Sequence, residues 1–194
     1  LLESGSWPDL LPTLFAFSQS LDPAKRLSGI TIINHLTPYL AVADKDDFPN
    51  LLTVFQQSLK QYDHPLIQVE ACRAICSLLL KLQTPETLPF VILIPLILRA
   101  LGDMLNHNRV LFAREIIKAL CDLVEVHPTF FKQNLESLIN AMVSIARAVG
   151  IDHDTRQSAL EFLTLLSENS PVMIRSLPLT TFVIPLLRSE ERRV

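Results

Sequence analysis

The sequence predicts an all-α protein built from tandem antiparallel helix pairs, and three observations lead to this fold class. Apolar residues recur at intervals of three and four along nearly the whole chain, as helices that pack on one side require. The 194 residues include only four glycines, and few stretches alternate apolar and polar residues as strands do. Small residues also return inside the predicted helices at a nearly constant step.

This repeat is defined by Gly29, Ala71, Ala113 and Ala159, which follow one another at steps of 42, 42 and 46 residues. HEAT-type helical repeats have lengths of about 40 to 47 residues. A small side chain at this position lets two helices approach closely. Because one helix pair cannot bury its apolar stripe alone, we expect the pairs to stack into an α-α superhelix, a HEAT-repeat solenoid.

Two polar series share the register of the small residues. Seven positions earlier stand candidate N-caps, whose side chains can accept hydrogen bonds from the first amides of a helix, with histidine as the exception: Asp22, His64, Asn106 and Asp152. Three positions before each small residue lies a polar ladder with one apolar member: Arg26, Gln68, Val110 and Arg156.

Prolines indicate where the helices of each pair begin and end. One series follows an apolar residue and suits the first turn of a helix: Pro12, Pro49, Pro95 and Pro185. A second series is expected to end the second helix of each pair: Pro38, Pro85, Pro128 and Pro171.

These signals place a first (A) and a second (B) helix in each repeat. The A helices are expected near residues 9–19, 48–61, 90–105, 130–147 and 179–188, and the B helices near 23–36, 65–82, 109–126 and 155–169. The chain is then a single array, 1–194, with repeats near 7–43, 44–86, 87–128 and 129–170 and a partial repeat at 171–194.

Composition excludes several classes of function. The apolar run from Leu88 to Leu98 is too short to span a membrane, and prolines interrupt it. A net charge of −3 without a basic block disfavours direct nucleic acid binding. The start of the chain, which has neither an initiator methionine nor a basic leader, suggests a piece of a larger protein. The odd set Cys72, Cys76 and Cys121 forms no disulfide framework and fits a reducing compartment.

Three segments carry a resemblance to the importin-beta (karyopherin-beta) family of nuclear transport receptors. They are Trp7-Pro8-Asp9-Leu10-Leu11, the stretch from Leu120 to Pro128, and the stretch from Gln157 to Glu168. The last segment is most similar to the karyopherin beta-three branch, also called importin five. The resemblance covers essentially the whole chain.

This resemblance implies a soluble receptor that shuttles between cytoplasm and nucleus. Such a receptor carries basic cargo, for example ribosomal proteins and histones, through nuclear pores and releases it on binding Ran in its GTP form. In the family, B helices line the concave face and hold cargo and Ran. The A helices form the outer face, which contacts the FG-rich proteins of the pore.

Charged stripes on the predicted B helices are the candidate binding residues for cargo or Ran. Clustered carboxylates there would attract a basic ligand, although ordinary solvated helix faces have the same pattern. The candidates are Glu70, Arg73, Glu115, Lys118, Asp122, Glu125, Arg156, Glu161 and Glu168. Leu165, on the last of these helices, is expected in the core.

No catalytic, cofactor or metal site is expected. The five histidines form no HExxH motif and no pair spaced for zinc, and the sequence contains neither GxSxG nor a glycine-rich phosphate loop. The alternative to a transport receptor is a HEAT-repeat scaffold subunit of a protein complex with no transport role.

Overall fold

The computed structural model describes residues 10–41 and 45–175, and these residues form helices and turns without a β-strand. The predicted all-α fold class is therefore confirmed. The chain divides into two compact units, the first ending at Lys81 and the second beginning at Leu82.

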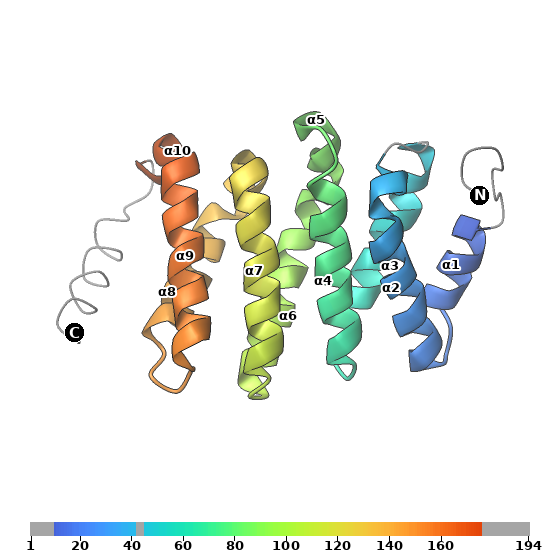
Figure 1. Ribbon diagram of the computed structural model, residues 1–194, viewed down its shortest axis with the longest axis horizontal. Coiled ribbons are helices and arrows are strands. Elements are labelled where there is room, and N and C mark those ends of the chain that lie inside the picture. The colour runs from blue at the N-terminus through green and yellow to red at the C-terminus, as the bar shows by residue number, and fades with distance from the viewer. Residues whose placement is uncertain (1–9, 42–44, 176–194) are drawn as a thin grey trace. The chain divides into compact units, whose positions relative to one another are not determined.

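The first unit contains two A–B helix pairs. In it α1 packs against α2, α3 packs against α4, and the two B helices, α2 and α4, lie side by side (Figure 1). Its elements are α1 (Leu10–Ser18), α2 (Pro23–Leu40), the 3-10 turn η1 (Lys45–Asp47), α3 (Phe48–Leu59) and α4 (Pro65–Leu79).

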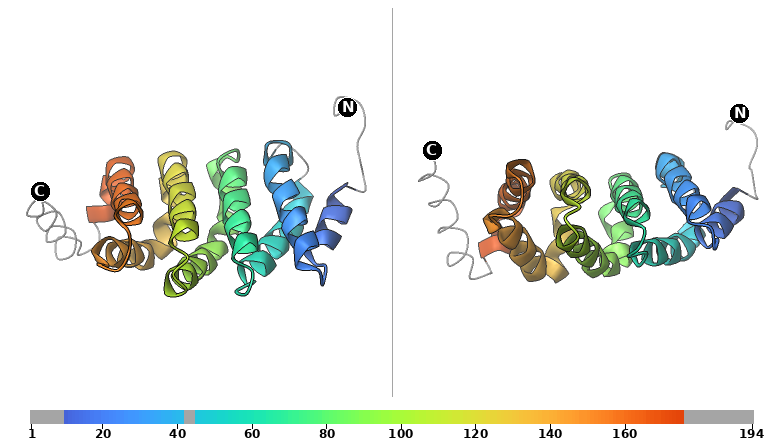
Figure 2. Two further views of the ribbon diagram at one scale, coloured as in Figure 1. Left: turned by 60° about the horizontal axis from the view of Figure 1, so that its bottom comes forward. Right: turned by 90° about the horizontal axis from the view of Figure 1, so that it is seen from below.

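The second unit repeats this arrangement with α6 against α7, α8 against α9, and the B helices α7 and α9 side by side. The two layers of A and B helices within each unit are visible in Figure 2. Its elements are α5 (Thr84–Thr87), η2 (Leu88–Leu93), α6 (Ile94–Asn106), α7 (Val110–Val126), η3 (Pro128–Asn134), α8 (Leu135–Arg147), α9 (His153–Asn169) and α10 (Pro171–Arg175). The A helices predicted near 90–105 and 130–147 thus each begin as a 3-10 segment.

The small residues that define the repeat are all buried in the B helices. Gly29 is buried, and Ala71, Ala113 and Ala159 are each 0% exposed. A Cβ added to Gly29 would lie only 3.0 Å from Phe17 Cβ and 3.1 Å from the Ser18 amide nitrogen, both in α1. The predicted close helix approach is therefore present in the first pair.

Two of the predicted N-caps are confirmed and one is wrong. Asp22 accepts a hydrogen bond from the Ala24 amide at 2.9 Å, and Asp152 accepts one from the Thr155 amide at 3.2 Å. Asn106 does not begin α7 but is the last residue of α6.

The turn after α6 explains this error. Asn108 has a φ of 56°, and its amide donates to the Leu105 carbonyl at 3.0 Å, while the Arg109 amide donates to the Met104 carbonyl at 2.8 Å. These two bonds and the left-handed residue form a Schellman motif, in which asparagine takes the place usual for glycine. The turn therefore depends on Asn108 as the C′ residue of α6 and not on a cap for α7.

In the first unit, the polar ladder ties α2 and α4 to the turn before each helix. The Arg26 guanidinium donates to the carbonyls of Ser20 and Leu21 at 2.8 and 2.9 Å. Gln68 is fully buried and donates to the carbonyl of Leu59, the last residue of α3, at 2.9 Å. Gln68 thus satisfies a carbonyl that the end of α3 leaves without an amide donor, and Arg26 satisfies two carbonyls of the turn between α1 and α2.

Pro38 does not end its helix as predicted, because α2 continues through it to Leu40. A proline has no amide proton for the carbonyl four residues earlier, which here belongs to Asn34. The hydroxyl of Thr37 donates to that carbonyl instead, at 2.9 Å. By contrast, Pro85 and Pro171 lie in the first turn of the next element, and Pro128 begins η3.

Three further sequence predictions concern the chain ends, Leu165 and the apolar segment after the first unit. The helix predicted at 179–188, Pro185 and Trp7 lie outside the described residues. Leu165 is only half-buried, and the fully buried side chains of α9 are Phe162 and Leu166. The segment Thr84–Asn106 is long and apolar enough to cross a membrane, but it is divided into α5, η2 and α6, with Phe90, Leu93 and Ile97 in the core.

Candidate functional site

The predicted binding residues lie on the solvent side of the B helices. Arg73, Lys118, Asp122, Glu125, Glu161 and Glu168 are exposed, and Glu70, Glu115 and Arg156 are half-buried. Helical spacing thus predicted the exposure of six of these nine side chains. Whether they bind a ligand stays a prediction.

In the first unit, the charge of Glu70 is already compensated. Its carboxylate accepts hydrogen bonds from Arg73 at 2.8 Å on the same helix and from the Asn34 amide group on α2 at 3.4 Å. With 18% of its side chain exposed, Glu70 is more enclosed than Arg73, at 43%. This group links α2 to α4 and leaves little free negative charge.

In the second unit, carboxylates from two helices gather around one buried thiol. Asp122 and Glu125 belong to α7 and Glu161 to α9. Burial first, and then the charges of Glu161, Asp122 and Glu125, raise the pKa of the Cys121 thiol to about 12. The Cys121 thiol also contacts the Ser158 carbonyl of α9 at 3.9 Å, one helical turn before Glu161, so α7 and α9 meet beside these residues. We call Asp122, Glu125 and Glu161 the carboxylate cluster.

No cation within residues 10–41 and 45–175 forms an ion pair with this carboxylate cluster. Lys118 lies one turn before Asp122 on α7 but does not bond to it. Glu168, two turns beyond Glu161, extends the same acidic face of α9. Among the described residues, the carboxylates of this cluster on α7 and α9 therefore have no ion-pair partner.

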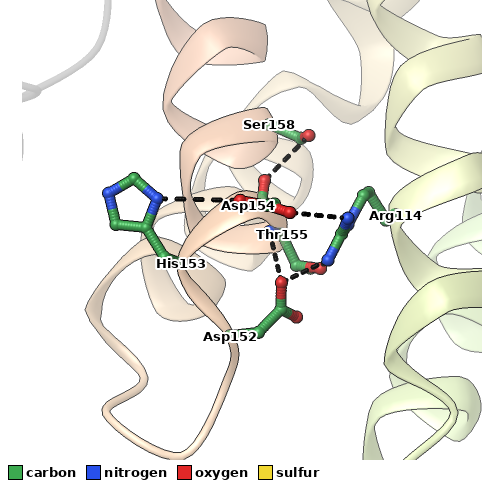
Figure 3. Close-up of polar contacts among 6 residues, drawn as sticks. All are labelled: Arg114, Asp152, His153, Asp154, Thr155 and Ser158. Carbon is green, nitrogen blue, oxygen red and sulfur yellow. Dashed lines mark hydrogen bonds and ion pairs between the residues drawn. The ribbon is translucent and has the colours of Figure 1, made fainter.

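A second polar group joins α7 to the start of α9, as Figure 3 shows. The Arg114 guanidinium donates to Asp152 Oδ1, to Asp154 Oδ2 at 2.9 Å and to the Thr155 hydroxyl at 3.1 Å. Burial of Asp152 opposes its ionisation, but hydrogen bonds from Thr155 and the charge and hydrogen bond of Arg114 outweigh it and lower the pKa of the Asp152 carboxyl. Arg114 is thus a fixed connection between neighbouring repeats.

The sequence sets Arg114 apart from the equivalent residues of the other repeats, although the pattern of charged stripes on the B helices did not include it. One position after the small residue, the other B helices carry Ile30, Cys72 and Leu160, so arginine is the only charged residue there. It also stands one repeat before the two aspartates that open α9. Arg156, a predicted site residue, has a buried Nε atom and so contributes to packing at the start of α9.

Cysteine and histidine side chains do not form a reactive group among the described residues. The three cysteines are buried and form no disulfide with one another, and burial, followed by the charge of Cys76, raises the pKa of Cys72. His127 is buried after α7, whereas His107 and His153 are exposed at turns. No cluster of three metal-binding side chains occurs in the described ranges.

A cavity of about 660 Å³ lies at the turn edge of the first unit, away from the charged stripes. Its walls are mostly polar, and they come from the α1–α2 and α3–α4 turns: Ser18, Gln19, Ser20, Leu21, Arg26, Gln57, Lys60, Gln61, Tyr62, Asp63 and His64. None of the predicted binding residues contributes to it.

Comparison with known proteins gives one family and several close folds. The family model described as "IPO5-like, TPR repeats" matches residues 2–141. Importin subunit beta-3 of Saccharomyces cerevisiae is 28% identical over 171 residues, which is 88% of this chain and 15% of that protein. The chain's own repeat of 42 to 46 residues is longer than the 34 residues of a TPR unit and within the HEAT range.

Solved structures of Kap121p have the same fold. Kap121p bound to the SUMO protease Ulp1p matches with a TM-score of 0.78 and 27% identity, covering 89% of this chain and 16% of that one. A Kap121p mutant with three acidic residues replaced by lysine matches with a TM-score of 0.79 and 26% identity, covering 91% and 17%. The chain thus spans about one sixth of the length of these relatives.

Proposed function

This chain belongs to the importin-beta family, in its importin-five-like branch, and we propose that it forms part of a nuclear transport receptor. We further propose that the acidic B-helix face of its second unit binds basic protein cargo. The family match over residues 2–141 is the observation that carries the first statement. The carboxylate cluster of Asp122, Glu125 and Glu161 supports the second.

The chemistry of the cluster fits a lysine- or arginine-rich segment. Its three carboxylates come from two helices, are exposed and lack ion-pair partners among the described residues. In bulk water, a carboxylate and a cation about 4 Å apart attract each other by about 1 kcal/mol. The attraction is stronger where the bound ligand displaces water from between them. Lys118, on the same helix, would repel such a segment, so it should lie toward the Asp122 side of α7.

Glu70 and Glu115 have a smaller part in this proposal. Glu70 already bonds to Arg73 and Asn34, so a ligand would have to compete with both. Glu115 is half-buried and has an interaction of its own. Glu168 would extend the acidic face for a longer basic segment.

Charge reversal tests the cargo proposal. In the parent receptor, the pair Asp122→Lys and Glu161→Lys should weaken binding of a lysine-rich cargo peptide by at least about tenfold, and the loss should shrink as salt rises. The measurement is fluorescence anisotropy at two salt concentrations, together with a melting curve.

Glu136→Lys is the matched control, because Glu136 is exposed on α8, an A helix of the same unit. It should leave cargo affinity unchanged, and all three substitutions should change stability by no more than about 0.5 kcal/mol. Cargo affinity that is unaltered by the Asp122 and Glu161 substitutions, with an intact melting curve, would refute the assignment.

The family resemblance also supports proposals on further partners and location. We propose that the parent binds Ran-GTP and FG-rich pore proteins and shuttles between cytoplasm and nucleus. A pull-down with Ran loaded with GTP or GDP separates this role from that of a scaffold, because a transport receptor should retain only the GTP form. Equal retention of both forms, or of neither, would favour the scaffold.

A further inference from the structure

The sequence contains three positions where a hydroxyl residue precedes proline: Thr37, Thr84 and Ser170. Proline-directed protein kinases phosphorylate such dipeptides when both residues are accessible. The structure separates the three by burial and hydrogen bonding. Of these three residues, Thr84 is the one that is exposed to solvent.

Thr37 is closed to a kinase, since its side chain is 2% exposed and its hydroxyl donates to the Asn34 carbonyl. Ser170 is half-buried at the junction of α9 and α10. Thr84 is exposed, as are Gln83 and Pro85 on either side of it. Within the described residues, the Thr84 hydroxyl has no hydrogen-bond partner.

Thr84 also lies at a particular place in the chain. It is the first residue of α5, a helix of four residues, and stands three positions after Lys81, where the first unit ends. A helix this short has little stability of its own. Its shape depends on a few local hydrogen bonds around Thr84.

Two of these bonds involve Glu86. The Glu86 carboxylate accepts from the Gln83 amide at 3.0 Å, as in one half of a capping box, and the Glu86 amide donates to the Gln83 carbonyl at 2.9 Å. The third bond runs from the Thr87 hydroxyl to the Thr84 carbonyl at 2.7 Å. Thr84 thus lies within the capped turn, while its side chain is exposed to solvent.

We propose that Thr84 is a phosphorylation site for a proline-directed serine/threonine kinase, and that its phosphate opens the cap of α5. In the transfer, the Thr84 hydroxyl oxygen bonds to the γ-phosphorus of ATP and the bond from that phosphorus to the ADP oxygen breaks. The hydroxyl proton passes to the catalytic base of the kinase, and ADP leaves.

The effect on α5 follows from charge. A phosphothreonine carries about −1.5 to −2 charges near neutral pH, beside the carboxylate of Glu86. Like charges two residues apart in the same helical turn repel, so we expect the Glu86 carboxylate to leave the Gln83 amide. The first turn of α5 then loses the hydrogen bond from the Gln83 amide to the Glu86 carboxylate.

The first test is phosphorylation of the folded 194-residue chain by a cyclin-dependent kinase with ATP, followed by mass spectrometry. Thr84 should be modified at least about tenfold faster than Thr37, because folding protects only the latter. Synthetic peptides centred on Thr37 and on Thr84 should both be modified, which shows that sequence alone does not discriminate. Pro85→Ala should abolish modification of the folded chain at Thr84.

Equal rates at Thr37 and Thr84 in the folded chain, or an unmodified Thr84 beside a modified peptide, would overturn the site. The effect on α5 is tested by hydrogen exchange. Exchange of the Gln83 amide should be at least about threefold faster in the phosphorylated chain. The Glu86→Gln variant has no carboxylate for the phosphate to repel, so phosphorylation should leave the exchange rate of its Gln83 amide unchanged. In the parent chain, exchange of the Gln83 amide that is slower or equal after phosphorylation would overturn the opening of the cap.

Discussion

Gly29 lies where α2 comes closest to α1, and its missing side chain decides the distance between the two helices. The atoms that an added Cβ would meet are Phe17 Cβ and the Ser18 amide nitrogen. Neither can rotate away, since one belongs to the backbone and the other is attached directly to it. Relief would require α1 or α2 to shift.

We therefore expect Gly29→Ala to lower the free energy of unfolding by about 1–2 kcal/mol, since overpacking outweighs the helix propensity of alanine. Gly102→Ala is the control, because an added Cβ on α6 meets nothing within 4 Å. That variant should be stabilised by up to about 1 kcal/mol. Urea denaturation measures both, and stabilisation of both variants would contradict the close approach.

Single residues also account for two errors of sequence interpretation. Pro38 predicts a helix end, but the Thr37 hydroxyl replaces the missing amide donor, and this compensation depends on a rotamer that a sequence pattern does not contain. Asparagine is a preferred N-cap residue, so Asn106 predicts a helix start, yet Asn108 takes the left-handed conformation and ends α6. In both cases a nearby residue, Thr37 or Asn108, changes the outcome that Pro38 or Asn106 alone would predict.

At the scale of helices, Arg114 joins α7 to α9 through three acceptors on one turn. Its partners are partly solvated, with Asp152 40% and Asp154 68% exposed, so the ion pairs are screened. Arg114→Met should cost about 1–2 kcal/mol near neutral pH. Lys118 lies on the same helix and forms no ion pair with another described residue, so Lys118→Met should cost less than about 0.5 kcal/mol.

The cost should depend on pH with a definite sign. Because the pKa of Asp152 is lowered in the folded chain, its contribution to stability is present above the ordinary carboxyl pKa of about 3.9 and is lost as pH falls through the folded value. The difference between Arg114→Met and the parent should therefore be largest near neutral pH and shrink in acid. Thermal melts at several pH values measure it, and a constant difference would show that Arg114 acts by packing alone.

Helix positions were largely predictable because apolar spacing follows burial, and burial dominates the stability of these pairs. The polar contacts were less predictable. The stripe pattern placed Asp122, Glu125 and Glu161 on the surface, but their gathering at Cys121 depends on how α7 and α9 align. Arg114 was missed because its acceptors lie 38 to 41 residues away in sequence.

At the scale of the whole molecule, stability should be distributed locally, because each helix pair packs mainly on its neighbours in sequence. Leu166 is 0% exposed at the core of the last described B helix. Leu166→Ala should cost about 2–5 kcal/mol, whereas Leu165→Ala, at the half-buried neighbouring position, should cost distinctly less.

Hydrogen exchange locates the effect of Leu166→Ala. Protection should fall in α7, α8 and α9 of the second unit and change little in α2 and α4 of the first. An equal loss of protection in both units would mean that the 194 residues unfold as one cooperative body. Equal costs at Leu165 and Leu166 would contradict the burial of α9.

The position of Cys121 beneath three carboxylates has one more consequence. Its resistance to ionisation arises partly from their negative field, so a basic segment resting on α7 and α9 would cancel some of that field. The sulfur would then give up its proton more readily and react faster with an alkylating reagent small enough to reach it. The alkylation rate of Cys121 would thus report whether a basic segment occupies α7 and α9.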